Sequence, residues 1–584
     1  MLGTTVVVRP PANHDTFACS RHLLGATAVL AVLGAAFLGL GLRQAWSDSL
    51  TYDEPTYISS GLVAVVAHDL SLNPEHPPLY KALAVLPALA VHPVIPPGYR
   101  HMTESDYAYR FVQAQQQAGK LRAVVFLSRV LPLLEGLAVG IVLFVLGKRL
   151  FGTAAGLLAA GLWLADPLVL GLAHLDGIDV TTTLAVVLLA WALLNALRDP
   201  APRRLHILGI AAGSTVLADD YGFVLAVLAA MIIAFGVAPT IAIGPPGRGR
   251  WQRGLTRFVR VLVAGWVTVL VAYAVLDPAS LWPAIVVPGP LVHGLRYLLA
   301  HDTQPSVGYL LGVSWRGGRW WYWPVSLAVK VPWPSLVVLV GGLLVSPWVP
   351  RQRRRQVVLI AVLPALAVIA VLTAVGRDIG VRYALPVVAL WSLAASPVAA
   401  LAIGEARRAR WRTTAWLPAA VTVLLVGLSA AQTVRSAPHS LAWVNPLLGP
   451  SYRVVTNSSG DWGQDFYALE RWSAGKRPFV VYSGTGLTLA NIVGARPLIV
   501  DIKGVATSVD PTGLHGWVAA SASDLTSTYP VELRWLRAYC PVEDLSGTIL
   551  IYHFLAPPHL VDGPTKPAPL CPGSASSLAA SSAR

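Results

Sequence analysis

The sequence predicts an α-helical polytopic membrane protein, with about eleven transmembrane helices and a small external α/β domain. Three observations predict this fold class. Only 12% of the 584 residues are charged, against roughly a quarter in soluble domains. Apolar runs long enough to span a bilayer recur along most of the chain. Beyond residue 434, short strand patterns alternate with Gly, Asn and Asp turns.

Eleven apolar runs are predicted to span the membrane. They cover residues 23–42, 123–146, 152–172, 180–197, 205–217, 222–240, 261–277, 321–347, 356–374, 384–403 and 414–434. The run at 205–217 is short, but the alternation of the loops requires it. The first run is long enough to span and lacks a convincing signal-peptide cleavage site.

The net charge of +15 comes from short basic clusters between these runs. The clusters lie near Lys148 and in residues 198–204, 247–260, 351–355 and 405–412. With a cytoplasmic N-terminus, all of them fall on the cytoplasmic side, as the positive-inside rule requires. This pattern predicts a multi-pass protein of the inner or plasma membrane and argues against nucleic-acid binding. A patch for anionic membrane lipids is the lesser alternative.

The same alternation divides the chain into parts. These are a cytoplasmic lead (1–22), a membrane domain (23–434) whose external loop 43–122 is catalytic, an external α/β domain (435–560) and a disordered Pro- and Ser-rich tail (561–584). In the loop, two interfacial helices are expected, near 55–68 and 78–89. Cys540 and Cys571 are exported and could form a disulfide, whereas Cys19 would be cytoplasmic and free.

The external loop opens with the acidic pair Asp53 and Glu54, in "TYDEPTYISSG". Adjacent side chains point apart in a helix or a strand, so the two carboxylates cannot face one substrate atom. One would act as a base, and the other would hold the backbone or orient another group. A carboxylate that loses hydration at a membrane interface becomes a better proton acceptor. A solvated loop that caps a helix at Pro55 is the alternative.

The motif "NPEHPPLYK" follows in the same loop. Its X-Pro steps hold Glu75 and His76 on a stiff segment before a helix. These two residues are candidates to bind a divalent metal or a sugar, and Lys81 is a further candidate for substrate contact. One Glu beside one His is half a metal site. We expect the missing ligand from His301, or from His293, with purely structural histidines as the alternative.

Five motifs, in chain order, resemble those of polyprenyl-phosphate-sugar-dependent membrane glycosyltransferases. This superfamily includes protein O-mannosyltransferases and the lipid A aminoarabinose transferase, and one bacterial branch carries a C-terminal external domain. The motifs are the first loop, "HLDGIDVTTT", "SVGYLLGVSWRGGRWWYWPVSLAVKVPWP", "DIGVRYALPV" and "NSSGDWGQDFYALERW". The resemblance implies a GT-C-type fold.

It also implies a reaction. One sugar would pass from a polyprenyl-phosphate donor to an acceptor hydroxyl outside the cytoplasm, with inversion at the anomeric carbon. The acceptor would be a protein, a glycolipid or a glycan. Asp53 matches the family's catalytic carboxylate, and Glu75 matches a position that binds metal, acceptor or sugar. The alternatives are a non-catalytic protein that binds lipid-linked sugar, and a transporter, which would need charges near the bilayer midplane.

Cations should stabilise the phosphate that leaves. Arg382 can hold phosphate oxygens bidentately, and Lys330 could snorkel outward to assist. An interfacial anchor is the alternative for Arg382. Tyr383 stands where relatives often have His after this arginine.

Three pairs of external residues complete the predicted site. Relatives carry a lysine near the end of the fifth span, where this chain has Asp219 and Asp220, which would repel a phosphate unless a metal bridges them. Asp176 and Asp179 would offer a compensating metal or sugar site. Asp461 and Trp462 suit contact with a sugar, with docking of the external domain as the alternative.

Overall fold

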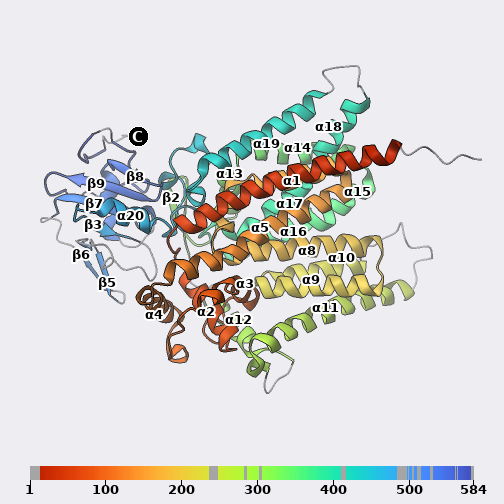
Figure 1. Cartoon of the computed structure of the whole chain (residues 1–584), viewed down its shortest axis with the longest axis horizontal. Helices are drawn as coiled ribbons and strands as arrows, with labels where there is room; N and C mark the ends of the chain where they lie inside the picture. Colours follow the sequence, from red (N-terminus) through yellow and green to blue (C-terminus); the bar gives the residue numbers. More distant parts are fainter. Residues whose placement is uncertain are drawn as a thin grey trace, which may run out of the picture.

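The computed structural model describes most of the chain. The described residues are 14–235, 248–281, 286–301, 306–408, 416–482, 496–497, 499–502, 505–508, 514–526, 531–559, 561, 563–571 and 573–579. They form a long helical bundle with a smaller α/β domain at one end (Figure 1). The predicted fold class, a mostly helical polytopic protein with a small C-terminal α/β part, is confirmed.

Each of the eleven predicted spans corresponds to one or more helices. In chain order these are α1 (His14–Ser47), α5 (Leu121–Phe151), α6 (Thr153–Leu164) with α7 (Pro167–Ala173), α8 (Ile178–Arg198), α9 (Pro202–Ala218), α10 (Gly222–Phe235), α11 (Arg248–Leu276), α13 (Tyr322–Lys330) with α14 (Trp333–Val345), α15 (Arg351–Val357) with α16 (Leu363–Val375), α17 (Leu385–Ala395) with α18 (Pro397–Arg408), and α19 (Leu417–Ser436).

In the described part of the chain, seven helical segments are long and apolar enough to cross a membrane. The bent pair α6–α7, with a 62° break, makes an eighth. Asp166 caps α7 at Leu168 N (2.8 Å), and Pro167 disfavours helical geometry in the residue before it. Helices α9, α10 and α14 are shorter, and Pro332 separates α13 from α14. The short predicted run at 205–217 is therefore a helix, but its length alone does not span a bilayer.

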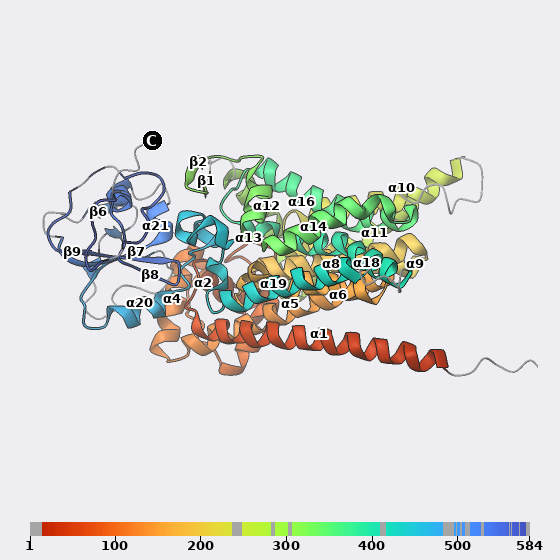
Figure 2. The ribbon, with the colours of Figure 1, turned by 90° about the horizontal axis from the view of Figure 1, so that it is seen from above.

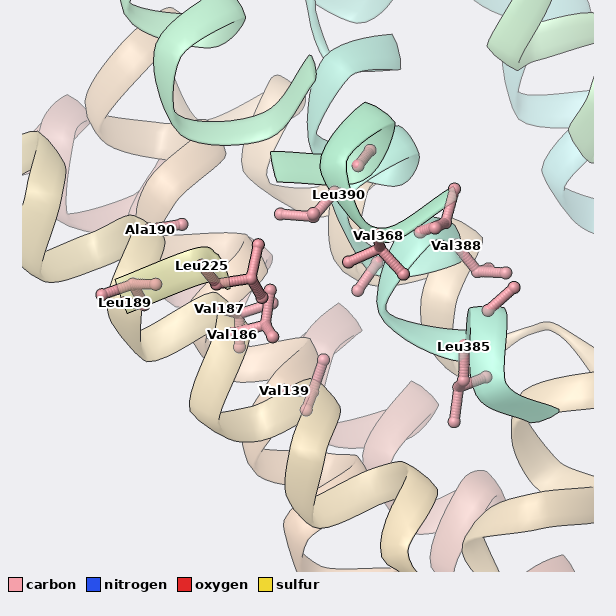
Figure 3. Close-up of a cluster of buried hydrophobic side chains, with 14 of the residues drawn as sticks. Val139, Val186, Val187, Leu189, Ala190, Leu225, Val368, Leu385, Val388 and Leu390 are labelled. Atoms are coloured by element: carbon pink, nitrogen blue, oxygen red, sulfur yellow. The ribbon is translucent and has the colours of Figure 1, made fainter. Parts of the chain in front are cut away.

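The bundle core is built from apolar side chains of helices that are distant in sequence. Figure 3 shows Val139 of α5, Val187 of α8 and Leu225 of α10 near Val368 of α16 and Leu385 of α17. All five side chains are buried. Within a bilayer, close packing rather than the hydrophobic effect holds such helices together. This core fixes the positions of the helix ends, and so of the loops they carry.

The connections divide between the two ends of the bundle. The start of α1, the end of α10, the start of α11, the end of α18 and the start of α19 lie at the end far from the α/β domain (Figures 1 and 2). The first loop lies at the opposite end, beside that domain, and includes α2 (Glu54–Val66), α3 (Pro78–Ala84) and α4 (Glu104–Gln117). Helix α12 (Gly289–His301) and the hairpin β1 (Val307–Leu310) and β2 (Val313–Arg316) lie at this end too.

The C-terminal domain contains a five-stranded mixed sheet with strand order β4-β3-β7-β9-β8. Its strands are β3 (Phe479–Val481), β4 (Arg496–Pro497), β7 (Gly516–Ser521), β8 (Glu543–Leu545) and β9 (Ile549–Phe554); β5 (Ile499–Ile502) pairs separately with β6 (Val505–Ser508). Helices α20 (Phe466–Ser473) and α21 (Ala522–Thr526) accompany the sheet.

The end of the chain differs from the sequence prediction. Cys540 and Cys571 form the expected disulfide, with Cα atoms 5.5 Å apart. The expected disorder after residue 560 is wrong for the described residues, because Ser576 N donates to His553 O and Ala579 N to Ala538 O. Composition suggested disorder, but the disulfide and these backbone hydrogen bonds hold the segment on the domain.

Candidate active site

Asp53 lies immediately before α2, at the end of the bundle that carries the α/β domain. Its Oδ2 accepts hydrogen bonds from Arg382 Nη2 (2.8 Å) and from Tyr57 Oη (3.1 Å). The side chain is 23% exposed. Among the described residues, none donates to its Oδ1. Asp53 therefore has one oxygen held by the protein and one available to a hydroxyl group of a substrate.

Arg382 lies in a single 3-10 turn, η6 (Val381–Ala384), that leads into α17. The turn is anchored where Val381 N donates to Ser459 Oγ (2.9 Å). The Arg382 guanidinium is 4.6 Å from the ring centroid of Tyr383 and 4.4 Å from that of Trp462. Among the described residues, its Nε and Nη1 have no hydrogen-bond partner. These two nitrogen atoms of the buried guanidinium are therefore available to bind an anion.

Of the two acids in "HLDGID", only Asp179 joins this centre. Its Oδ2 is 3.9 Å from Arg382 Nη1. Asp176 instead has both carboxyl oxygens buried without a hydrogen-bond partner in the described structure. Burial, with a further contribution from the charge of Glu54, raises the pKa of Asp176 well above its ordinary value. The structure therefore does not bring Asp176 to the Arg382 side chain, and its expected role in a metal or sugar site stays a prediction.

Glu54, expected among the catalytic residues, is structural. Its carboxylate is fully buried and accepts from Arg129 Nε (2.7 Å) and Nη2 (2.6 Å), and from the backbone N atoms of Thr51 and Asp176. Burial alone would raise the pKa of Glu54, but the charge and hydrogen bonds of Arg129 outweigh it and hold this pKa below 4.5. Of the two adjacent acids, Asp53 faces the centre and Glu54 holds the loop.

A second cluster, which we call the NPEH cluster, comprises Asn73, Glu75, His76, Lys81 and Glu104. Asn73 Nδ2 donates to Glu75 and Glu104, and Glu75 Oε1 is 3.2 Å from His76 Nδ1. The fully buried Lys81 donates from Nζ to the backbone O and the Oδ1 of Asn73. These contacts fix the motif that the X-Pro steps predicted to be stiff.

The NPEH cluster lies next to the Asp53 centre. Tyr57 Oη, which donates to Asp53, is also 3.5 Å from His76 Nε2. Burial raises the pKa of Glu104, and the charge of Glu75 raises it further. Burial would also raise the pKa of Glu75, but the hydrogen bond and charge of His76 bring this pKa below 4.5. The pKa values of the two neighbouring acids are therefore shifted in opposite directions.

The expected metal site gains no support from these contacts. Among the described residues, no group of three or more His, Cys, Asp and Glu side chains is arranged to hold a metal ion. Glu75 and His76 pair with each other and with Asn73. The side chain of His301, expected as the partner ligand, lies outside the described residues, as does that of Cys19. His293, on α12, has an exposed side chain.

Lys330 makes its hydrogen bonds away from the Asp53–Arg382 pair, and its expected role at the donor phosphate stays a prediction. Its buried Nζ donates to three backbone carbonyl oxygens, those of Leu441, Trp443 and Ser459. These bonds use all three of its protons. Because Ser459 also anchors Val381, Lys330 acts as a support beneath the turn that carries Arg382.

The motif "GDWGQD" docks the α/β domain onto the first loop. Tyr52 N donates to Trp462 O (2.8 Å), and Ser49 N donates to Gln464 O (2.8 Å). Asp461 accepts from Ser523 N (2.9 Å), and burial raises its pKa to about 6. The contacts with the first loop thus come from the backbone of Trp462 and Gln464, whereas the Asp461 side chain bonds within the α/β domain and the Trp462 ring contacts Arg382. Trp462 was expected to stack on a sugar. In the structure, the Arg382 guanidinium lies over one side of its ring.

The acids of the α9–α10 connection include one, Asp220, whose charge acts on Lys81. Asp219 is buried, which raises its pKa well above the ordinary value, with a further contribution from Asp220. The charge of Asp220 in turn raises the pKa of Lys81, against the larger lowering effect of burial. A lysine from the first loop therefore interacts electrostatically with one of the acids that occupy the position where relatives have a lysine.

Sequence reasoning missed three members of these networks. Glu104 could not be linked to Glu75, because nothing in the chain between them indicates proximity. Arg129, however, lies inside a predicted span, and a charged residue there signals a buried partner. His174, whose Nε2 is 2.9 Å from Asp48 Oδ2 with both groups buried, belongs to the quoted motif "HLDGID" but was not singled out.

Comparisons with known proteins agree with the motif-based resemblance. Residues 120–246 match the family described as dolichyl-phosphate-mannose-protein mannosyltransferase. This match confirms that the chain is similar to the polyprenyl-phosphate-sugar-dependent glycosyltransferases over that segment. Among curated proteins, a search found no match.

Three solved structures are also similar to this chain, at low sequence identity. ArnT from Cupriavidus metallidurans bound to undecaprenyl phosphate is 14% identical, with a TM-score of 0.43, over 90% of this chain and 98% of that one. The apo oligosaccharyltransferase of Archaeoglobus fulgidus is also 14% identical, with a TM-score of 0.43, over 77% and 58%. AglB from the same archaeon, in complex with an inhibitory peptide and a dolichol-phosphate, is 14% identical, with a TM-score of 0.41, over 70% and 56%.

Proposed function

We propose that this protein is an inverting glycosyltransferase that moves a sugar from a polyprenyl-phosphate donor to an acceptor hydroxyl at the external face of the membrane. The observation that carries the proposal is the Asp53–Arg382 pair, which joins a partly exposed carboxylate to a guanidinium with two unused donors. The family matched by residues 120–246 is named for a lipid-phosphate sugar donor. The five motifs resemble those of enzymes that use the same class of donor, which also supports the proposal.

In the proposed reaction, Asp53 acts as the general base. Its Oδ1 takes the proton of the acceptor hydroxyl as that oxygen attacks the anomeric carbon. The bond between this carbon and the phosphate oxygen breaks with its electron pair, and polyprenyl phosphate leaves. Arg382 receives the developing negative charge through Nε and Nη1. Bond formation on the face opposite the leaving phosphate inverts the anomeric centre.

The proposed orientation places this centre outside the cytoplasm. The basic start of α11 and the basic helix α15 lie at the far end of the bundle, as the positive-inside rule requires for a cytoplasmic side. The Cys540–Cys571 disulfide lies in the α/β domain, at the same end of the molecule as the Asp53–Arg382 centre. Disulfides persist in oxidising compartments. A donor whose prenyl chain stays in the bilayer can then present its phosphate to the first loop.

Sealed membrane vesicles test this proposal. Right-side-out and inverted vesicles that contain the protein are supplied with polyprenyl phosphates that carry a labelled mannose, glucose, arabinose or aminoarabinose, together with an extract of cell-envelope acceptors. We expect labelled product only when donor and acceptor reach the external face. The control variant is Asp199→Asn, which removes an exposed ion pair with Arg204. We expect this variant to transfer sugar as fully as the wild type does. An absence of transfer from every donor, on either side, would refute the proposal.

Donor binding by the purified protein distinguishes the alternative, a non-catalytic protein that binds lipid-linked sugar. Asp219 and Asp220 favour this alternative, because two acids replace the lysine that relatives place near the donor. It predicts that labelled donor is retained by the purified protein and that no polyprenyl phosphate is released.

A further inference from the structure

A small cavity lies between the α/β domain and the membrane domain, beside the centre but separate from it. Its volume is about 190 Å³. Its lining comes from four segments: Tyr52 of the first loop, strand β1, residues 456–462 and helix α21. Sites for drug-sized ligands occupy roughly 300–1,000 Å³, so this cavity suits a single small ring.

The polar groups of the cavity are fixed by hydrogen bonds with each other. Ser523 Oγ donates to Asp461 O and accepts from Asn457 N (2.9 Å). Thr526 Oγ1 donates to Thr456 Oγ1. Asn457 has a φ of 52°, in the left-handed region that most residues avoid. The exposed Asn457 side chain accepts from Ser458 N through Oδ1 (2.8 Å), which leaves its Nδ2 protons for a ligand.

The chemistry of the lining selects a neutral ring with many hydroxyl groups. Tyr52, Tyr309 and Trp462 supply aromatic surface, and the amide, hydroxyl and carboxylate groups supply donors and acceptors in fixed positions. Two acids, Asp461 and Asp524, would repel a phosphate. The donor phosphoester therefore belongs on the Arg382 side of Trp462, and the cavity is left for the other substrate.

The cavity and the centre share a wall. Trp462 lines the cavity, and the Arg382 guanidinium lies 4.4 Å from the centroid of its ring. Tyr52 lines the cavity and directly precedes Asp53. A ring bound in the cavity would thus share the Trp462 wall with Arg382 and contact the residue that precedes the proposed base.

We propose that this cavity is an acceptor subsite that binds one neutral sugar ring, so that the acceptor is a glycan or a glycolipid. The assignment to the acceptor rests on the proposed function, whereas binding of a sugar ring does not. No reaction takes place in the subsite; it orients the acceptor for the proton transfer to Asp53.

Binding is tested with free sugars and no donor. The full chain is placed in phospholipid nanodiscs without glycolipid or sugar-based detergent. Saturation-transfer NMR then measures the binding of the methyl glycosides of mannose, galactose, glucose and arabinose. We expect at least one glycoside to bind to the wild-type protein and to Asp53→Asn alike. Asn457→Gly keeps the backbone conformation and removes the amide, and should weaken this binding by about tenfold, as expected for the loss of a good polar contact.

Two variants control for indirect effects. His92→Gly relieves another left-handed residue, at φ 48°, in the first loop outside the cavity. Tyr109→Ala removes an exposed aromatic ring on α4 and is matched to Tyr52→Ala in the cavity. We expect the two controls to bind glycoside as the wild type does and Tyr52→Ala to bind it several-fold more weakly. The subsite proposal is overturned if no glycoside binds, or if Asn457→Gly and Tyr52→Ala bind as the controls do.

Kinetics then separate the two proposals. If transfer occurs in the vesicle assay, Asn457→Gly should raise KM for the acceptor by about tenfold and leave KM for the donor unchanged. Transfer with an unchanged acceptor KM would contradict the subsite and leave the proposed function standing. Glycoside binding without transfer from any donor would contradict the proposed function instead, and the cavity would remain a sugar-binding site.

Discussion

Arg382 Nη2 donates to Asp53 Oδ2 over 2.8 Å, although 329 residues separate the two in the chain. The contact joins the first external loop to the turn before α17. In this pair the proposed base and the proposed phosphate ligand neutralise each other before substrate arrives. A phosphate bound to Arg382 would compete for that charge and free the carboxylate to accept a proton.

The first prediction concerns Arg382. Arg382→Lys should lower kcat/KM for transfer by about 100-fold, the usual cost of losing one preorganised donor to a developing anion. A lysine is a point charge and cannot both contact Asp53 and fill the space between Tyr383 and Trp462. The measurement is transfer kinetics together with the affinity for polyprenyl phosphate alone. Arg204→Lys, at an exposed pair with Asp199, is the control. Equal kinetics in the two variants would remove Arg382 from the phosphate site.

The second prediction concerns the buried pair of Glu54 and Arg129. Glu54→Gln should lower the free energy of unfolding by about 3–5 kcal/mol, because it leaves the buried guanidinium without its counter-charge. Asp199→Asn, in an exposed pair, should cost at most about 1 kcal/mol. Unfolding of the purified protein in mixed micelles measures both values. A stable Glu54→Gln protein that has lost transfer would restore Glu54 as a catalytic residue.

The third prediction concerns the pH dependence of stability at Lys81. Burial lowers the pKa of Lys81 to about 7, from 10.5. Between these values the unfolded chain binds more protons than the folded chain, so the folded state gains stability as pH rises, by up to about 1.4 kcal/mol per pH unit. Lys81→Met should remove this rise from the unfolding profile between pH 7 and 10. Identical slopes for the two proteins would show that Lys81 keeps its charge when buried.

The fourth prediction concerns the disulfide. In a Cys19→Ser background, the denatured protein should react with a maleimide only after reduction. Cys540→Ser should lower the stability of the α/β domain by about 2–4 kcal/mol, since the bond closes a segment of 31 residues. The measurement is a gel shift combined with thermal unfolding. Two thiols that react without a reductant would place this domain in a reducing compartment.

Much of the fold could be predicted because hydropathy acts locally. Each of the eleven apolar runs corresponds to helix in the described residues. The exact span lengths could not be predicted: α9 is shorter than a bilayer, and Pro332 breaks the run at 321–347. The tail after residue 560 was missed because its composition says nothing of the disulfide partner that holds it.

The candidate site could be predicted residue by residue, but not as a set of contacts. The motifs pointed to Asp53, Arg382 and Trp462 separately, and tertiary packing brings them together. Because adjacent side chains point apart, the sequence indicated that Asp53 and Glu54 have different roles. The contact of Arg129 with Glu54 identifies Glu54 as the residue that holds the loop. The contacts of Lys330 could not be predicted. A lysine near a membrane surface suggests snorkelling, whereas here its ammonium group donates to backbone carbonyl groups.

The most direct test of Asp53 as the base is a single-turnover measurement with Asp53→Asn. Enzyme in excess is mixed with labelled polyprenyl-phosphate sugar and acceptor, and the release of polyprenyl phosphate is followed while donor binding is measured in parallel. We predict that release slows by about 100- to 10,000-fold and that the donor still binds. Release at the wild-type rate, with the asparagine confirmed in place, would contradict the account.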